Sequence, residues 1–207
     1  MGAEQEKGHR KARGAVDPVD RYLNEVVEAI KSLPRKEIWQ VVEALREARD
    51  EGRQLFLVGN GGSAATASHM ACDLAKTSLK PGARRIRAIA LTDNVPLITA
   101  WGNDVSFEDV FSEQLSNLVQ AGDLVIALSG SGNSPNVLRA VEVAQKMGAR
   151  TVGFTGQPGG RLKGMVDICV VVQSRRIEQA EDVHLILDHL VTVALREAAV
   201  VEELGAA

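Results

Sequence analysis

Short apolar runs alternate with helical patterns along the chain, and this alternation limits the fold more than any other feature. The apolar runs lie at 55–58, 86–91, 124–128, 151–154 and 168–172. Helical patterns lie between them at 63–77, about 107–119 and 134–147, with a short turn at 161–165 and a last helix from about 177 to 203. Apolar strands that are separated by helices form a buried parallel sheet. The sequence therefore predicts an α/β fold with a doubly wound parallel sheet.

Two further helical patterns precede the first strand. Asp17 and Pro18 suit the N-cap and first turn of a helix, and Pro34 ends its apolar pattern. A second helix runs from about 36 to 50. We expect these helices to cover the sheet or to form an oligomer surface. Residues 1–16 are predicted to be a mobile tail, and residues 17–207 a single domain.

Composition and charge exclude several classes of protein. Hydrophobic residues make up 45% and charged residues 25%, which are ordinary globular values. A net charge of −3 argues against a nucleic-acid partner, because binding to phosphate backbones needs a basic surface. No run reaches the ~18 apolar residues of a membrane span, and the first residues lack the apolar segment of a secretory signal. Cys72 and Cys169 lie in apolar runs, which is typical of reduced, buried thiols. We therefore expect a cytoplasmic protein with no membrane partner.

The loop after the first strand, residues 59–63, is rich in glycine and opens a helix. Glycines let the backbone approach an anion, and a helix N-terminus offers free N–H groups. Its pattern also fits G-x-G-x-x-A of dinucleotide sites, but Asp93 comes well beyond the ~20 residues at which those sites place their acidic residue. A Walker A motif is absent from the sequence. A tight structural turn is the alternative interpretation.

A second polar loop, Ser129-Gly130-Ser131-Gly132-Asn133-Ser134, also follows a strand and opens a helix. Ser134 and Pro135 suit the N-cap and first helical position, and a simple capped turn is the alternative. The serines and glycines can surround a phosphate without adding charge. If the strand order is 2-1-3-4-5, the two loops follow neighbouring strands and face each other at the topological switch point. Together they predict a small phosphorylated ligand.

Three segments, GNGGSAATASH, LTDNVPLITAWGNDVSFEDVF and LSGSGNSPNVLRA, resemble the sugar isomerase (SIS) family and, within it, the phosphoheptose isomerases. The resemblance implies a three-layer α/β/α sandwich with a five-stranded sheet, and a homotetramer with active sites between subunits. It also implies isomerisation of sedoheptulose 7-phosphate to D-glycero-D-manno-heptose 7-phosphate through an enediol. Two alternatives stay open. One is a non-catalytic SIS regulator that binds a sugar phosphate or a replication-initiator partner, and the other is an isomerase of another phosphosugar.

The same resemblance assigns the substrate contacts residue by residue. The expected phosphate contacts are Ser63, Ser129, Ser131 and Ser134, with Gly130 where the family often has threonine. The expected sugar contacts are Asn60, Gly61, Gly62, Asn103, Asp104 and Glu181.

A histidine and a carboxylate one helical turn apart, His69 and Asp73, suit half of a zinc site, although an accidental i,i+4 pair is the alternative. The resemblance implies a zinc ion held by His69, Asp73, Glu181 and His189, with Asp73 and His189 as the acid–base residues. Asp73 replaces the family's glutamate and Glu181 its glutamine. Glu181 and His189 lie eight residues apart, or ~12 Å along a helix, so His184 is the alternative ligand. A residue that ligates the ion cannot also be a free base, so these roles compete.

Overall fold

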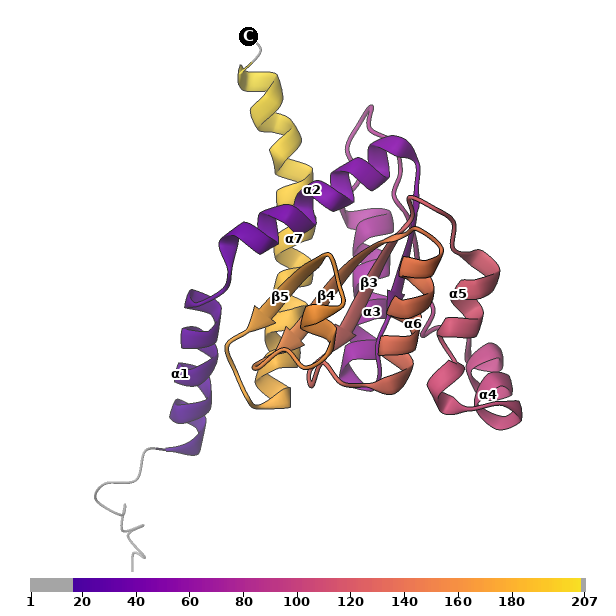
Figure 1. The fold of residues 1–207 in the computed structure, drawn as a ribbon. Helices are drawn as coiled ribbons and strands as arrows, with labels where there is room; N and C mark the ends of the chain where they lie inside the picture. Colours follow the sequence, from indigo (N-terminus) through magenta and orange to yellow (C-terminus); the bar gives the residue numbers. More distant parts are fainter. Residues whose placement is uncertain (1–16, 206–207) are drawn as a thin grey trace, which may run out of the picture.

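The sheet is entirely parallel, with the predicted order β2-β1-β3-β4-β5 (Figure 1). The computed structural model describes residues 17–205, with side chains through Glu197. The strands are β1 Gln54–Val58, β2 Arg87–Ala90, β3 Leu124–Ser129, β4 Arg150–Gly156 and β5 Ile168–Val172. Each agrees with a predicted apolar run. Because β1 and β3 are neighbours, the loops that follow them leave the same edge of the sheet.

Alternate residues of each strand pack into two separate hydrophobic cores, because successive side chains of a pleated strand point to opposite faces of the sheet. Leu57 and Ile126 pack into the core on one face, whereas Phe56 and Val125 pack into the core on the other. The first face is covered by α2 (Arg35–Glu51), α3 (Gly62–Cys72) and α7 (Ile177–Gly205), and α1 (Pro18–Lys31) packs against α7. The second face is covered by α4 (Val95–Asp104), α5 (Ser112–Leu118) and α6 (Pro135–Lys146) (Figure 1). The predicted three-layer sandwich is confirmed.

Helix boundaries differ from the prediction in three places. The helix predicted at 63–77 begins as α3 but ends in a π-helical turn, Asp73–Thr77. The helix predicted at about 107–119 is split into a 3₁₀ turn, Phe107–Asp109, and α5. Helix α4 was not predicted, although Asn94 caps it by accepting a hydrogen bond from the Leu97 amide at 3.2 Å. Within the described range, no helix is both long and apolar enough to cross a bilayer.

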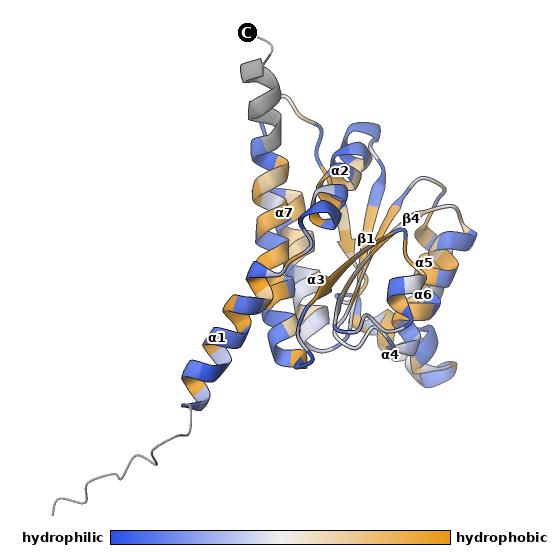
Figure 2. Cartoon of the chain, turned by 60° about the vertical axis from the view of Figure 1, so that its left-hand side comes forward, coloured by the Kyte–Doolittle hydropathy of each residue, from blue (hydrophilic) through white to orange (hydrophobic). Residues whose placement is uncertain are grey.

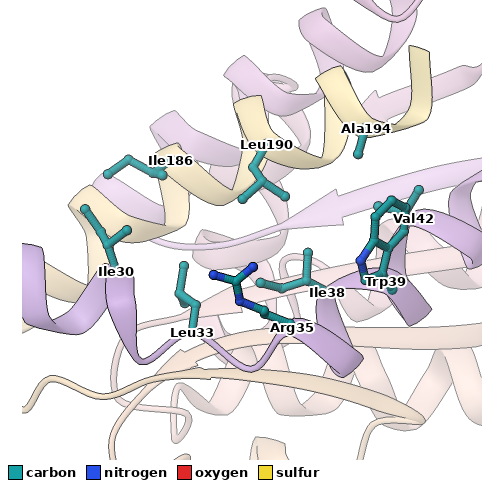
Figure 3. A pocket seen from close by; sticks show the side chains of 9 residues that line it. All are labelled: Ile30, Leu33, Arg35, Ile38, Trp39, Val42, Ile186, Leu190 and Ala194. Atoms are coloured by element: carbon teal, nitrogen blue, oxygen red, sulfur yellow. The ribbon is translucent and has the colours of Figure 1, made fainter. Parts of the chain in front are cut away.

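An apolar groove of about 270 Å³ lies where α1, α2 and α7 meet (Figure 3). Its walls are largely aliphatic, and Trp39 at its end is 59% exposed. Helix α1 carries further apolar residues (Figure 2), and two of them, Val19 and Leu23, are exposed. These N-terminal helices therefore leave a broad apolar face uncovered in the single chain. The groove is lined by Ile30, Leu33, Arg35, Ile38, Trp39, Val42, Ile186, Leu190 and Ala194.

Candidate functional site

The glycine-rich first loop (residues 59–63) and the serine-rich second loop (residues 129–134) are joined by a pair of amides. Asn60 Nδ2 donates to Asn136 Oδ1 at 2.8 Å, and Asn136 Nδ2 donates back to Asn60 Oδ1 at 2.9 Å. Asn136 lies in the first turn of α6 and is only 2% exposed. The reciprocal pair fixes the distance between the two loops across the switch point. Sequence reasoning did not single out Asn136.

The second loop presents its hydroxyl groups together at the N-terminus of α6. Ser129 Oγ and Ser134 Oγ lie 3.0 Å apart, and the Gly132 amide donates to Ser129 Oγ at 3.2 Å. Ser134 occupies the predicted N-cap position, but its side chain makes no capping hydrogen bond. Ser131 is exposed. The loop therefore combines a helix N-terminus with hydroxyl groups that can turn towards an anion.

A carboxylate from another helix already lies against the first loop. Glu181 of α7 lies directly over Gly62, so closely that a side chain on Gly62 would overlap its carboxyl group. Gly61, with φ of 54°, is the N-cap of α3, and Ser63, an expected phosphate contact, lies inside the helix and is 4% exposed. The partial positive charge at the N-terminus of α3 is therefore already opposite the carboxylate of Glu181. The geometry therefore favours the second loop as the phosphate site.

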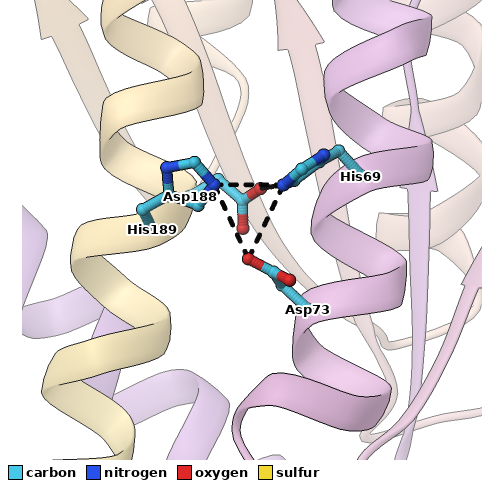
Figure 4. Close-up of side chains that lie close together, drawn as sticks. All are labelled: His69, Asp73, Asp188 and His189. Carbon is cyan, nitrogen blue, oxygen red and sulfur yellow. Dashed lines mark hydrogen bonds and ion pairs between the residues drawn. The ribbon is translucent and has the colours of Figure 1, made fainter.

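Four side chains from α3, the π-helical turn and α7 converge into one cluster, whose ligand atoms all lie within 4.8 Å of one another (Figure 4). The His69 and His189 Nε2 atoms are 3.0 Å apart. Asp73 Oδ2 lies 3.7 Å from His69 Nε2 and 3.8 Å from His189 Nε2. Asp188 Oδ2 lies 4.0 Å from His69 Nε2. Donors on a tetrahedral zinc ion, bound at ~2.0–2.1 Å, stand roughly 3.3 Å apart, so this cluster can hold a divalent ion.

Thr77 fixes the orientation of Asp73. Its Oγ1 donates to Asp73 Oδ1 at 2.8 Å, so the other carboxylate oxygen faces the two imidazoles. Both residues belong to the π-helical turn, a local distortion that is frequent at functional sites. The turn therefore gives the short aspartate side chain a fixed direction into the cluster.

Asp188 is the cluster residue that sequence reasoning missed. Its side chain is fully buried, and no full hydrogen bond to either carboxylate oxygen is made by the described residues. Burial, together with the nearby charge of Asp73, raises the pKa of Asp188 to about 7, although the Thr192 hydroxyl partly opposes this shift. The sequence does contain one sign of its role: Asp188 is an acidic residue within the largely apolar stretch 185–191, directly before His189.

The predicted ligand set is brought together only in part. His69, Asp73 and His189 meet, but Glu181 lies at the first loop and Asp188 takes its place in the cluster. The physical reason is the helical rise that separates Glu181 from His189. The alternative ligand, His184, is also outside the cluster. It is buried with its ring 6.0 Å from that of Phe154, and burial lowers its pKa to about 4.

Two predicted sugar contacts lie in a different layer. Asn103 and Asp104 are exposed at the end of α4, where Asn103 Nδ2 donates to Asp104 Oδ1 at 2.7 Å. Helix α4 packs on the face of the sheet opposite to α3 and α7. Within one chain, these two residues therefore lie on the other side of the sheet from the His69 cluster.

A parallel five-stranded sheet with two phosphate-suited loops at its switch point is the architecture of an α/β protein that binds a phosphorylated ligand. The SIS domain model matches residues 20–156. The chain is 41% identical over 152 residues to the phosphoheptose isomerase of Nitratiruptor sp., covering 73% of this chain and 81% of that protein. The chain therefore belongs to the phosphoheptose isomerase family of SIS-domain proteins.

Two further relatives span most of the chain. A probable phosphoheptose isomerase of Thermoplasma acidophilum is 36% identical over 177 residues, covering 86% of this chain and 97% of that protein. The solved structure of the phosphoheptose isomerase GmhA from Neisseria gonorrhoeae superposes with a TM-score of 0.78 at 30% identity, covering 86% of this chain and 94% of that one. The similarity therefore extends over most of the chain, and the family model itself begins at residue 20, within α1.

Proposed function

We propose that the chain is an isomerase that interconverts sedoheptulose 7-phosphate and D-glycero-D-manno-heptose 7-phosphate. One observation carries the proposal. Helix α3 begins at the first loop, which is hydrogen-bonded through Asn60 to Asn136 beside the serine-rich second loop. The same helix ends at a cluster of histidines and aspartates. A substrate held at the second loop by its phosphate can extend past the first loop towards that cluster. The names of the curated relatives support the same reaction.

The second loop binds the phosphate group in this proposal. The hydroxyl groups of Ser129, Ser131 and Ser134 donate to its oxygens, and the N-terminus of α6 stabilises its charge. Asn60 and the glycines beside it position the sugar chain. The carboxylate of Glu181 accepts hydrogen bonds from sugar hydroxyls at the first loop.

The reaction moves one proton between C1 and C2 and another between O1 and O2, through an enediol. A carboxylate base must take the proton from one carbon and return it to the other. Asp73 and His189 are the acid–base candidates, and Glu181 is the carboxylate that stays outside the cluster. The cluster of His69, Asp73, Asp188 and His189 would hold a zinc ion, which would supply Lewis-acid polarisation of the sugar carbonyl.

A second copy of the chain covers the apolar groove in this proposal, within a homotetramer. The groove adjoins the site, because Trp39 and Leu190 of the groove also line an open hollow with His189, whose side chain is 54% exposed. An oligomer would thereby shield the cluster from water. Light scattering at micromolar concentration tests this, and a monomer would contradict it. A free phosphorylated sugar as substrate also supports a cytoplasmic location.

The function is tested by incubating the purified chain with sedoheptulose 7-phosphate and measuring formation of the aldose, before and after chelation and zinc addition. We expect turnover that chelator removes and zinc restores. Pentose and hexose phosphates serve as parallel substrates, and faster turnover of one of these would point to another phosphosugar. Binding of sugar phosphate without turnover would instead favour the non-catalytic regulator. The division into a tail at 1–16 and one SIS domain at 17–207 stays a prediction, because residues 1–16 lie outside the described residues.

A further inference from the structure

We propose that Asp188 is the fourth protein ligand of the metal site, in the place that family resemblance gives to Glu181. The inference deepens the proposed function, because it concerns the ion which that function uses. Two observations support it: the position of Asp188 on α7 beside the other donors, and the lack of hydrogen-bond partners for its buried carboxylate.

The position of Asp188 brings it to the same point as three other donors. Asp188 directly precedes His189, and its Oδ2 lies 4.0 Å from His69 Nε2. The cluster that contains it has all ligand atoms within 4.8 Å, a separation that one ion can bridge with small side-chain movements. Glu181 instead lies two helical turns away, over Gly62.

The carboxylate of Asp188 also lacks the partners that a buried charge requires. Its side chain is 0% exposed, and among the residues described neither oxygen has a full hydrogen-bond partner. Buried carboxylates are normally paired, hydrogen-bonded or bound to a metal. The side chains nearest to it in the cluster are imidazoles and a second carboxylate, which are metal ligands themselves. A divalent cation satisfies both aspartates and both imidazoles at once, and two carboxylates balance its charge.

The consequence is that Glu181 and Asp188, both on α7, have separate roles. Asp188 completes the ion's protein shell with His69, Asp73 and His189. Glu181 is then left free at the first loop, where its carboxylate faces the sugar rather than the ion.

The test measures metal binding without substrate, so it is independent of turnover. Zinc affinity is determined by competition with a chromogenic chelator for the wild type, Asp188→Asn and the matched control Glu181→Gln. We expect Asp188→Asn to lower zinc affinity at least ~10-fold to 100-fold, the loss that even outer-sphere partners of a metal site can cause. Glu181→Gln should stay within about three-fold of the wild type, well short of that range. Equal affinity of Asp188→Asn and wild type, or an equal loss in both variants, would overturn the proposal.

If Asp188→Asn folds poorly, a second variant with a spectroscopic readout tests the same proposal. Asp188→Cys places a thiol at the same position, and a thiol that coordinates a metal is deprotonated. With Co²⁺ alone, we expect a thiolate-to-cobalt charge-transfer band in Asp188→Cys but not in Glu181→Cys. A folded Asp188→Cys that binds Co²⁺ without this band would show that position 188 is not a ligand. If the wild type is an active isomerase and Asp188→Cys lacks the band, this inference alone is rejected. If Asp188→Cys shows the band but the wild type does not turn over sedoheptulose 7-phosphate, the proposed function alone is rejected.

Discussion

Asn60 and Asn136 are bonded to each other through both of their side-chain amides, at 2.8 and 2.9 Å, and thereby join loops that are 76 residues apart. Asn136 Oδ1 also accepts from the Val137 amide at 2.9 Å, so the same side chain holds the first turn of α6. One buried amide therefore links the distance between the loops to the geometry of the phosphate site. No other residue type offers a donor and an acceptor in this planar arrangement, apart from the longer glutamine.

Replacing Asn136 by Asp should weaken both the fold and phosphate binding. The carboxylate can accept from Asn60 but cannot donate to it, so one bond is lost and two oxygens face each other. We expect the free energy of unfolding to fall by about 1–3 kcal/mol, the usual cost of an unsatisfied buried polar group. Urea unfolding measures this, with the exposed Asn117→Asp on α5 as the matched control. Equal stability of the two variants would show that the amide pair contributes little.

Ser131 should contribute to phosphosugar affinity but not to stability. Its hydroxyl is exposed at the second loop and accepts only a 3.2 Å hydrogen bond from the Asn133 amide. Ser131→Ala should weaken binding of sedoheptulose 7-phosphate by about 1–2 kcal/mol, the scale of a hydrogen bond to a charged group. Calorimetric titration measures the loss, and unphosphorylated sedoheptulose should bind poorly to both proteins. Equal binding of the sugar and its phosphate would rule out the second loop as a phosphate site.

The two glycines of the second loop should respond differently to alanine. Gly132 has φ of 65°, and a Cβ there would overlap the carbonyl oxygen of Gly159. Gly132→Ala should therefore cost at least about 2 kcal/mol of stability, because strain and overlap act together. A Cβ on Gly130 would lie 3.4 Å from Ile177 Cγ2, an ordinary contact. Gly130→Ala should keep near wild-type stability in the same thermal unfolding experiment, and a similar loss in both variants would contradict this account.

Thr77 should act on metal affinity through Asp73. Thr77→Val keeps the shape of the side chain but removes the hydroxyl that holds Asp73 Oδ1 at 2.8 Å. Loss of such a partner typically lowers metal affinity about 10-fold to 100-fold. Thr77→Ser retains the hydroxyl and should restore most of the affinity, which separates positioning from packing. Chelator competition with Zn²⁺ measures all three proteins, and a serine variant as weak as the valine variant would exclude the positioning role.

The fold was predictable because its signals are local. Each buried strand appears as an apolar run, and each phosphate-suited loop carries its own glycines and serines. Helix α4 escaped prediction because its start is marked only by Asn94 and Pro96, and none of its residues is buried. Without a buried face, the apolar periodicity that predicts a helix is weak.

The candidate site was only partly predictable because its remaining residues depend on contacts between distant segments. His69 and Asp73 are a helical turn apart and could be paired from spacing alone. Whether Asp188 or Glu181 meets them depends on which turn of α7 crosses α3, and spacing within α7 does not determine that crossing. The Asn60–Asn136 pair likewise requires the strand order to bring two loops together.

In the metal-free protein, His184 by itself should make the folded state less stable in acid. Burial lowers the pKa of this histidine from its usual 6.5 to about 4, while a backbone contact to Thr155 only partly opposes the shift. Between these two pH values the unfolded chain binds a proton that the folded chain excludes, so stability falls as pH falls. At about 1.4 kcal/mol per pKa unit, the full effect is on the order of 3 kcal/mol.

Asp188, four residues along the same helix, acts in the opposite direction. Its pKa of about 7 in the folded chain lies above the usual 3.8, so the folded chain takes up a proton as pH falls and gains stability. The two effects therefore largely cancel in the wild type between about pH 4 and about pH 6.5.

Single replacements should separate the opposing pH effects of His184 and Asp188 on stability. His184→Leu removes the acid-sensitive imidazole from its apolar site beside Phe154, so its melting temperature should rise relative to the wild type as pH is lowered from about 7 to about 5. Asp188→Asn removes the opposing carboxylate, so its melting temperature should fall more steeply than that of the wild type over the same range. Thermal unfolding in chelator at each pH measures all three proteins. Parallel curves for the wild type and His184→Leu would show that burial in the folded chain does not lower the pKa of the imidazole.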